Sequence, residues 1–207
     1  MSYESRKVIR ESAQGLSIIN IQDQLLDQRN VYLNSPLTEE TALELIHQFM
    51  YLESRTTEEP INFFINSPGG SVSDGMLVYD YLRMMKSRIR TICTGRACSM
   101  AALLLLAGEE RWMFKHAECM IHDASFAKAD FSGLKPDEIE ERTKELVETC
   151  RMLRDIISDR TGKSLEEVTK KMKKDSFFKA DEAVEFGLAT GIVESAGEMI
   201  IDTNELL

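Results

Sequence analysis

The segment that decides the fold is GRACSMAA, residues 95–102, which joins two apolar stretches of the chain. Before it, the β-branched run Thr91-Ile92-Cys93 is typical of a buried strand. After its serine, residues 100–107 are methionine, alanine and leucine only, which predicts a helix. A helix without a polar face must lie inside a core. The sequence therefore predicts a buried strand that leads directly into a buried helix.

Ser99 falls at the turn between that strand and that helix. Backbone N–H groups at a helix N-terminus have no intrahelical partner, so those of Ser99 and Met100 are suited to binding an oxyanion. Serine is also a common N-cap residue. This segment alone is equally compatible with a structural and a catalytic serine.

Composition limits the partners of the chain. It has 207 residues and a net charge of −10, which suits one domain with a sizeable core. The acidic balance argues against a nucleic-acid or anionic-membrane surface. We find no apolar run of membrane-spanning length and no signal-peptide core, so we expect a cytoplasmic protein without a membrane segment.

The cysteines do not predict a metal site. Cys93, Cys98, Cys119 and Cys150 form no C-x-x-C pair and no Cys/His spacing, which argues against zinc. We expect neither a metal nor a cofactor. Most of the four lie in apolar segments and are predicted to be buried free thiols of a reducing compartment.

Strand and helix signals alternate along the chain and predict an α/β fold with helices covering a sheet. Residues 1–16 are polar and weakly patterned, and we expect a flexible arm there. Residues 123–134 predict a loop or a mobile strand. The expected helices cover residues 21–28, 38–54, 73–86, 100–107, 136–160, a short stretch after 164, and 180–186. The expected strands cover residues 31–33, 61–65, 91–93, 112–114, 119–122 and 192–193.

Acyl transfer by a serine needs a base, a carboxylate that orients the base, and two N–H donors for the oxyanion. His122 ends an apolar run where a strand leaves the sheet, which fits either a structural or a catalytic role. His47 lies among polar residues and is predicted to be a surface side chain. Patterning alone does not select the carboxylate among Asp123, Asp175 and Asp181.

A glycine-rich turn, NSPGGSV at residues 66–72, follows the expected strand at 61–65. It matches neither G-x-x-x-x-G-K-[ST] nor G-x-G-x-x-G, so it is not a phosphate loop. The two glycines permit backbone geometry and close approach that side chains forbid. The segment predicts a tight turn or the rim of an active site.

Four segments in order resemble the ClpP family, the proteolytic subunit of the ATP-dependent Clp protease. They are residues 66–72, residues 95–101 around Ser99, MIH at 120–122, and KDSF at 174–177 with the residues through 188. The resemblance covers about residues 18–193. It implies a crotonase-like α/β subunit with a protruding handle helix.

The resemblance implies a role for each matching residue. Ser99 would be the nucleophile of a serine endopeptidase, His122 the general base and Asp175 the orienting acid. The N–H groups of Gly70 and Met100 would form the oxyanion hole. A strand through residues 70–72 and the segment after His122 would be the two walls of the peptide groove. The residues implied to bind substrate are Gly70, Ser71, Val72, Asp123, Ala124 and Ser125.

The family also implies an assembly. Two stacked rings of seven subunits enclose a chamber, and a ring-shaped Clp-type ATPase feeds unfolded polypeptides into it. The expected organisation is an axial segment at residues 1–17, one peptidase domain at 18–195 with a handle at about 123–160, and a tail at 196–207. The rings could be homomeric or could include a paralogous subunit.

The chain departs from the family at several places, and two of them adjoin residues implied to be catalytic. After His122 the family usually continues with Gln-Pro, whereas this chain has Asp123-Ala124. An acidic residue and an arginine usually precede the triad acid, whereas this chain has Lys173-Lys174, which cannot pair with each other. We expect a divergent member.

Three alternatives stay open from the sequence. A catalytically weak or regulatory subunit of a mixed ring is compatible with these departures. An acyl-CoA enzyme of the crotonase fold would need carboxylates at the thioester instead of a serine–histidine pair. A membrane-associated signal-peptide peptidase would need an anchor, which the sequence does not predict.

Overall fold

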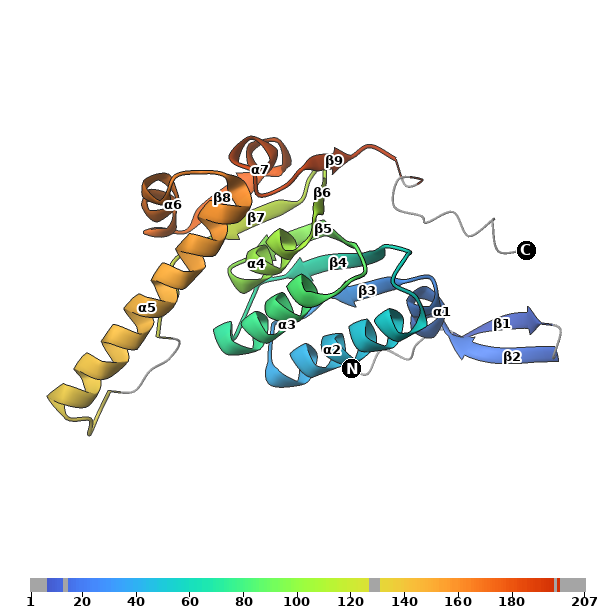
Figure 1. Ribbon diagram of the computed structural model, residues 1–207, viewed down its shortest axis with the longest axis horizontal. Helices are drawn as coiled ribbons and strands as arrows, with labels where there is room; N and C mark the ends of the chain where they lie inside the picture. The colour runs from blue at the N-terminus through green and yellow to red at the C-terminus, as the bar shows by residue number, and fades with distance from the viewer. Residues whose placement is uncertain (1–6, 13–14, 127–130, 196, 198–207) are drawn as a thin grey trace.

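The computed structural model describes residues 7–12, 15–126, 131–195 and 197, and shows a sheet with helices packed along it (Figure 1). The strands are β1 Lys7–Ser12, β2 Gly15–Asn20, β3 Asn30–Leu33, β4 Ile61–Ser67, β5 Ile89–Cys98, β6 Glu110–Phe114, β7 Glu118–Ile121, β8 Ser176–Lys179 and β9 Gly191–Val193. The helices are α1 Ile21–Asp27, α2 Glu39–Arg55, α3 Val72–Met84, α4 Met100–Ala107, α5 Pro136–Thr161, α6 Leu165–Met172 and α7 Ala180–Phe186. Each helix and strand expected from residue 21 onward is present except the implied strand through residues 70–72, and β8 was not predicted.

One long strand organises the sheet. Strands β3, β4, β5, β6 and β9 pair in that order and in parallel. Residues 90–93 of β5 pair with β6, whereas residues 96–98 pair with β7. Strand β8 then pairs with β7 in the antiparallel direction. The carboxyl end of β5 therefore lies beside the end of β7 and the start of β8.

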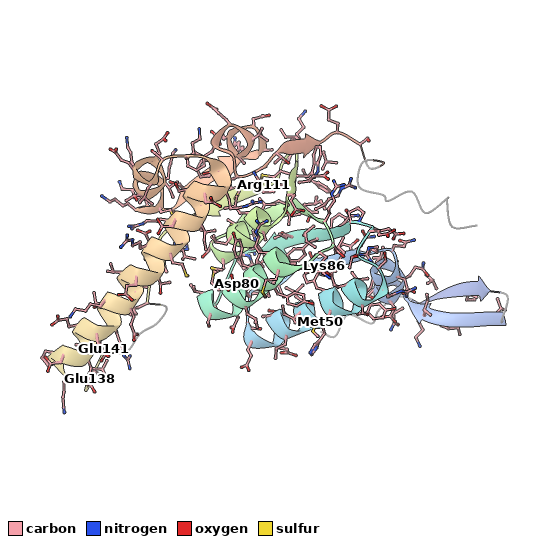
Figure 2. All side chains as sticks on the ribbon, viewed as in Figure 1. Met50, Asp80, Lys86, Arg111, Glu138 and Glu141 are labelled. Atoms are coloured by element: carbon pink, nitrogen blue, oxygen red, sulfur yellow. The ribbon has the colours of Figure 1, made fainter. Side chains whose placement is uncertain are left out.

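Helix α4 is buried as predicted, since all eight of its residues are inaccessible to solvent. The carbonyl groups at its end would be unsatisfied without side-chain donors. Arg160 donates to the carbonyls of Leu106 at 2.8 Å and of Gly108 at 2.7 Å. Arg111, labelled in Figure 2, also donates to the Gly108 carbonyl at 3.3 Å. Both cations also interact favourably with the negative end of the α4 helix dipole.

Helix α5 is the predicted handle. It begins with Pro136 and ends at Gly162, whose φ of 71° is left-handed. Its first half extends away from the sheet, and Glu138 and Glu141 mark the far end in Figure 2. Its second half packs on the core through Cys150, Leu153 and Ile157. Within the described residues, no helix is long and apolar enough to cross a bilayer.

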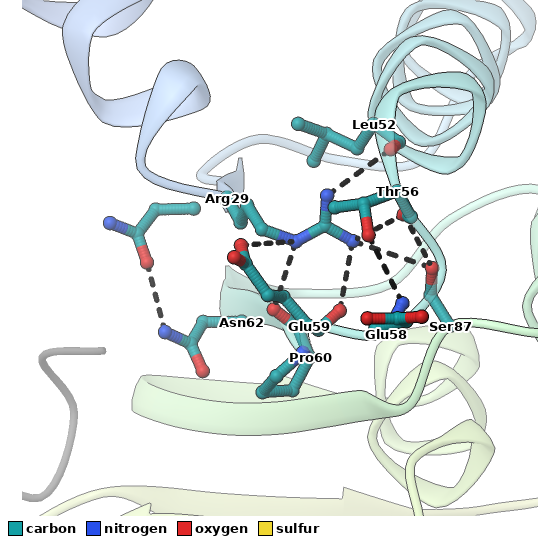
Figure 3. A network of polar contacts seen from close by, with 9 residues as sticks. Arg29, Leu52, Thr56, Glu58, Glu59, Pro60, Asn62 and Ser87 are labelled. Atoms are coloured by element: carbon teal, nitrogen blue, oxygen red, sulfur yellow. Dashed lines mark hydrogen bonds and ion pairs between the residues drawn. The ribbon is translucent and has the colours of Figure 1, made fainter. Parts of the chain in front are cut away.

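A buried arginine joins three segments of the chain (Figure 3). Arg29 precedes β3, has a φ of 61°, and is 5% exposed. Its guanidinium donates to the end of α2, to the loop before β4 and to the loop before β5. The acceptors are the carbonyls of Leu52, Thr56, Glu59 and Pro60 and the hydroxyl of Ser87. The sequence analysis did not identify this residue.

The N-terminal region differs from the expectation. Strands β1 and β2 form an antiparallel hairpin where a weakly patterned arm was predicted, and the expected boundary at residues 17 and 18 falls inside β2. The hairpin presents Ile9, Leu16 and Ile18 to solvent, each at least 70% exposed. Because these apolar side chains are exposed, the hairpin does not have the alternation of buried apolar and exposed polar residues by which a strand is recognised in a sequence. Of the predicted tail, residues 196 and 198–207 lie outside the described residues.

Candidate active site

Ser99 occupies a strained turn between β5 and α4. Its φ of 56° and ψ of −125° are rare for a residue with a side chain. Such a strand-to-helix elbow presents the side chain of its central residue away from the sheet. The Ser99 hydroxyl makes no capping bond to α4, so the structural N-cap alternative is not realised. The Ser99 N–H donates to the Met120 carbonyl at 2.8 Å, so the expectation that it serves as an oxyanion donor is wrong.

Ser99, His122 and Asp175 lie in one series of polar contacts. Ser99 Oγ is 2.9 Å from His122 Nε2, and His122 Nδ1 is 3.3 Å from Asp175 Oδ1. The histidine side chain is 29% exposed and the aspartate side chain 61% exposed. In this single chain the serine and the histidine are therefore partly buried, whereas the acid is open to solvent.

Strand pairing explains why these three residues meet. In the parallel pair of β5 and β7, Cys98 lies opposite Met120. In the antiparallel pair of β7 and β8, Ile121 lies opposite Ser176. Ser99 directly follows β5, His122 directly follows β7, and Asp175 directly precedes β8. The strand pairing therefore brings these three residues to one point.

The candidate carboxylates now separate. Asp175 contacts His122, whereas Asp123 forms an ion pair with Arg154 and Asp181 lies in the first turn of α7. His47, predicted to be a surface residue, is exposed. Among the described histidines, only His122 contacts Ser99.

The glycine turn lies directly against the serine elbow. Gly69 has a φ of 89°, and a Cβ there would lie 2.5 Å from the Cys98 carbonyl oxygen and 2.8 Å from Ser99 Cβ. Leu37 forms a parallel bridge with Gly70, because the Leu37 N–H donates to the Gly69 carbonyl and the Ser71 N–H donates to the Leu37 carbonyl. In such a bridge the N–H and C=O of Gly70 point away from Leu37.

Two N–H groups are left near the serine. Within the described part of the chain, neither Gly70 nor Met100 donates its backbone N–H to an acceptor. Gly70 is exposed, and Met100 N is 3.0 Å from the Cβ position of Gly69. The strand that the resemblance implies through residues 70–72 is not formed, because Gly70 makes only a bridge with Leu37, Ser71 is the N-cap of α3 and Val72 is its first residue.

The segment after His122 is a coil through residue 126, not a strand. Asp123 accepts two hydrogen bonds from Arg154 of α5, and the Ala124 carbonyl accepts from Cys150 Sγ at 3.5 Å. Hydrogen bonding to Asp123 raises the pKa of Arg154. Ser125 is exposed. The sequence analysis did not single out Arg154, although a charge beside the buried Leu153 was an available signal.

The cysteines are free and buried, as predicted. Burial raises the pKa of Cys93 to about 12, and it also raises the pKa of the Cys98 and Cys119 thiols. A thiol with a raised pKa carries little thiolate at neutral pH and is a poor nucleophile. Ser99, not its neighbour Cys98, is therefore the nucleophile candidate at the elbow.

A serine on a strained elbow, in contact with a histidine that faces a carboxylate, is the arrangement that defines the serine hydrolases. The family model of the Clp protease matches residues 13–196. Over 190 residues the chain is 37% identical to the ATP-dependent Clp protease proteolytic subunit of Bdellovibrio bacteriovorus, covering 91% of this chain and 89% of that protein. The chain belongs to the Clp protease family, a family of serine-type endopeptidases.

The predicted family and the predicted α/β fold are thus confirmed. Members of this family are oligomeric proteases that work with Clp ATPases on protein substrates.

Proposed function

We propose that this chain hydrolyses peptide bonds with Ser99 as nucleophile, His122 as general base and Asp175 as the acid that orients the histidine. The observation that carries the proposal is the series of contacts from Ser99 Oγ through both ring nitrogens of His122 to Asp175. Ser99 Oγ attacks the scissile carbonyl while His122 Nε2 takes its proton. The imidazolium then gives that proton to the leaving amine, and water hydrolyses the acyl-enzyme by the same route.

The tetrahedral intermediate needs two donors for its oxygen. We assign this role to the N–H groups of Gly70 and Met100, which flank the Ser99 elbow and have no acceptor among the described residues. The Met100 N–H also lies at the N-terminus of α4, where the helix dipole favours negative charge. Loss of one such donor costs about 100- to 1,000-fold in kcat.

The substrate binds as an extended chain beside Gly70, with Ser71 and Val72 at the same rim and residues 123–125 on the other side. The carbonyl and N–H of Gly70 point away from the Leu37 bridge, as main-chain pairing with a peptide requires. Main-chain pairing gives affinity with little side-chain preference. The expected substrates are therefore unfolded polypeptides of varied sequence.

The working assembly is two stacked rings of seven subunits, served by a Clp-type ATPase in the cytoplasm. Support comes from α5, whose projecting half exposes Val147 at 63%, and from Phe177, which is 55% exposed beside Asp175. Packing of another subunit against these side chains would remove their apolar surface from water. Four free cysteines suit a reducing compartment.

Labelling with a fluorophosphonate tests the proposal. The wild-type protein is expected to be labelled, and Ser99→Ala is expected to lose labelling and at least about 10⁴-fold of peptidase activity. Ser54→Ala, an exposed serine on α2, is the matched control and keeps both. Sedimentation gives the particle mass in the same samples.

A wild-type particle of about fourteen subunits that is not labelled contradicts the proposal. It favours the alternative, a catalytically weak or regulatory subunit of a mixed ring. Labelling that persists in Ser99→Ala contradicts the assignment of the nucleophile.

A further inference from the structure

We infer that Asp123 and Arg154 are a pair of positioning residues that hold His122 against Ser99 and connect the active site to the handle helix α5. The inference rests on the proposed function, because it takes His122 as the base. Neither residue touches the reacting atoms. They act through the backbone of the residue that does.

The pair has the geometry of a rigid clamp. Arg154 Nε donates to Asp123 Oδ1 at 2.8 Å, and Arg154 Nη2 donates to Asp123 Oδ2. Both side chains are only 24% exposed. A two-bond contact between a planar guanidinium and a planar carboxylate fixes direction as well as distance, which one lysine bond cannot do.

A second contact holds the same residue from the other side. The Asp123 N–H donates to the Met172 carbonyl at 2.8 Å. Met172 ends α6, is 1% exposed, and lies three residues before Asp175. Asp123, which follows the base directly, is therefore bonded both to α5 and to the segment that carries the triad acid.

His122 has few contacts of its own. Among the described residues, its ring has hydrogen-bond or ion-pair contacts only with Ser99 and Asp175. Asp175 is largely exposed and cannot fix the ring by packing. The position of His122 therefore depends on its backbone, which β7 holds on one side through Ile121 and Asp123 holds on the other. A shift of α5 moves Arg154 and, through the clamp, the base.

The chain offers a matched control on the same helix. Arg151 lies about one helical turn before Arg154 on α5, and its Nε is 4.0 Å from Asp155 Oδ2. The arginine side chain is 81% exposed and the aspartate side chain 55%. That pair does not reach the segment after His122. Arg151→Gln removes the same charge from α5 as Arg154→Gln but leaves the clamp intact.

The test compares Arg154→Gln, Asp123→Asn, their double variant and Arg151→Gln in assembled particles of verified mass. We expect each single clamp variant to lose about 10- to 100-fold in kcat for a short fluorogenic peptide and in the rate of Ser99 labelling. KM should change little, because the Asp123 carboxylate is already bonded to Arg154 and its amide analogue removes no main-chain contact to the peptide. The double variant should lose no more than the worse single variant, because both break one contact. Arg151→Gln should stay within about twofold of wild type.

The outcomes are separable. If wild type is labelled and the clamp variants react as fast, this inference fails and the proposed function stands. If wild type is not labelled at Ser99, both fail. If Arg154→Gln does not assemble, Arg154→Lys decides, since it keeps the charge but not the two parallel bonds. A slow Arg154→Lys particle supports the clamp, and one with the wild-type rate overturns it.

Discussion

Arg29 and Ser99 share an unusual backbone, and the comparison shows what each strained position is for. Among the described residues they are the two non-glycine residues with positive φ, at 61° and 56°. A side-chain-bearing residue in such a region costs about 1 to 3 kcal/mol, which its surroundings must offset. The two sites offset that cost in different ways.

At Arg29 the side chain has a structural role. Its guanidinium donates five hydrogen bonds, four to main-chain carbonyls and one to a hydroxyl, and it is nearly inaccessible (Figure 3). At Ser99 the offset comes from the backbone instead, through the N–H bond to Met120 and the buried helix that follows. The Ser99 hydroxyl contacts only His122 among the described residues. The strained backbone at Arg29 therefore places a side chain that stabilises the fold, whereas the strained backbone at Ser99 places a hydroxyl that is available to react.

The largest effect on stability should come from the architectural site. Arg29→Met is expected to lower the free energy of unfolding by about 3 to 5 kcal/mol, because it leaves several buried acceptors without a donor. Urea unfolding at fixed protein concentration measures this loss. Arg55→Met, in an exposed ion pair with Asp27 on neighbouring elements, is the control and should cost much less. Equal losses in the two variants would contradict a structural role for the Arg29 network.

The strain at Ser99 can be isolated from its chemistry. Ser99→Gly and Ser99→Ala both remove the hydroxyl, but only glycine adopts a φ of 56° without a Cβ clash. Ser99→Gly should therefore be more stable than Ser99→Ala by about 1 kcal/mol, after the entropy cost of glycine is included. Parallel thermal unfolding of the two inactive variants gives the difference. A glycine variant that is the less stable of the two would show that the elbow is unstrained.

The smallest effect concerns pH near the Arg29 network. Burial alone would raise the pKa of the Glu53 carboxyl, but hydrogen bonds from Ser87 and from the Lys86 N–H lower it below its ordinary value. A lowered carboxyl pKa stabilises the fold above the unfolded value of about 4.3, and this contribution is lost as pH falls through the folded pKa. Glu53→Gln should cost about 1 kcal/mol at pH 7 and less near pH 3.

Urea unfolding at several pH values between 7 and 3 measures this effect. Glu58→Gln, an exposed carboxylate on the adjacent loop, is the control and should follow the wild-type pH dependence. A gap between wild type and Glu53→Gln that stays constant into acid would refute the linkage.

Local sequence was sufficient for most of the elements. The apolar residues of α4 have no alternative to burial, and Thr38, Pro136 and Ser164 mark helix starts that the structure bears out. The sequence analysis did not predict the hairpin of β1 and β2 or strand β8, because their hydrophobic patterns are weak. The first does not pack on the core, and in β8 only Phe178 is buried.

The sequence by itself determined the buried strand and helix around Ser99, the α/β class and the glycine turn, because propensity and apolar periodicity are local properties. Patterning left Asp123, Asp175 and Asp181 open and the family resemblance implied Asp175, but only the tertiary structure shows that Asp175 lies at the His122 ring. That choice depends on the register of β7 with β8, a pairing of strands more than fifty residues apart. Only the folded chain also joined Asp123 to Arg154, because side chains so far apart in the sequence meet through packing that no local pattern records.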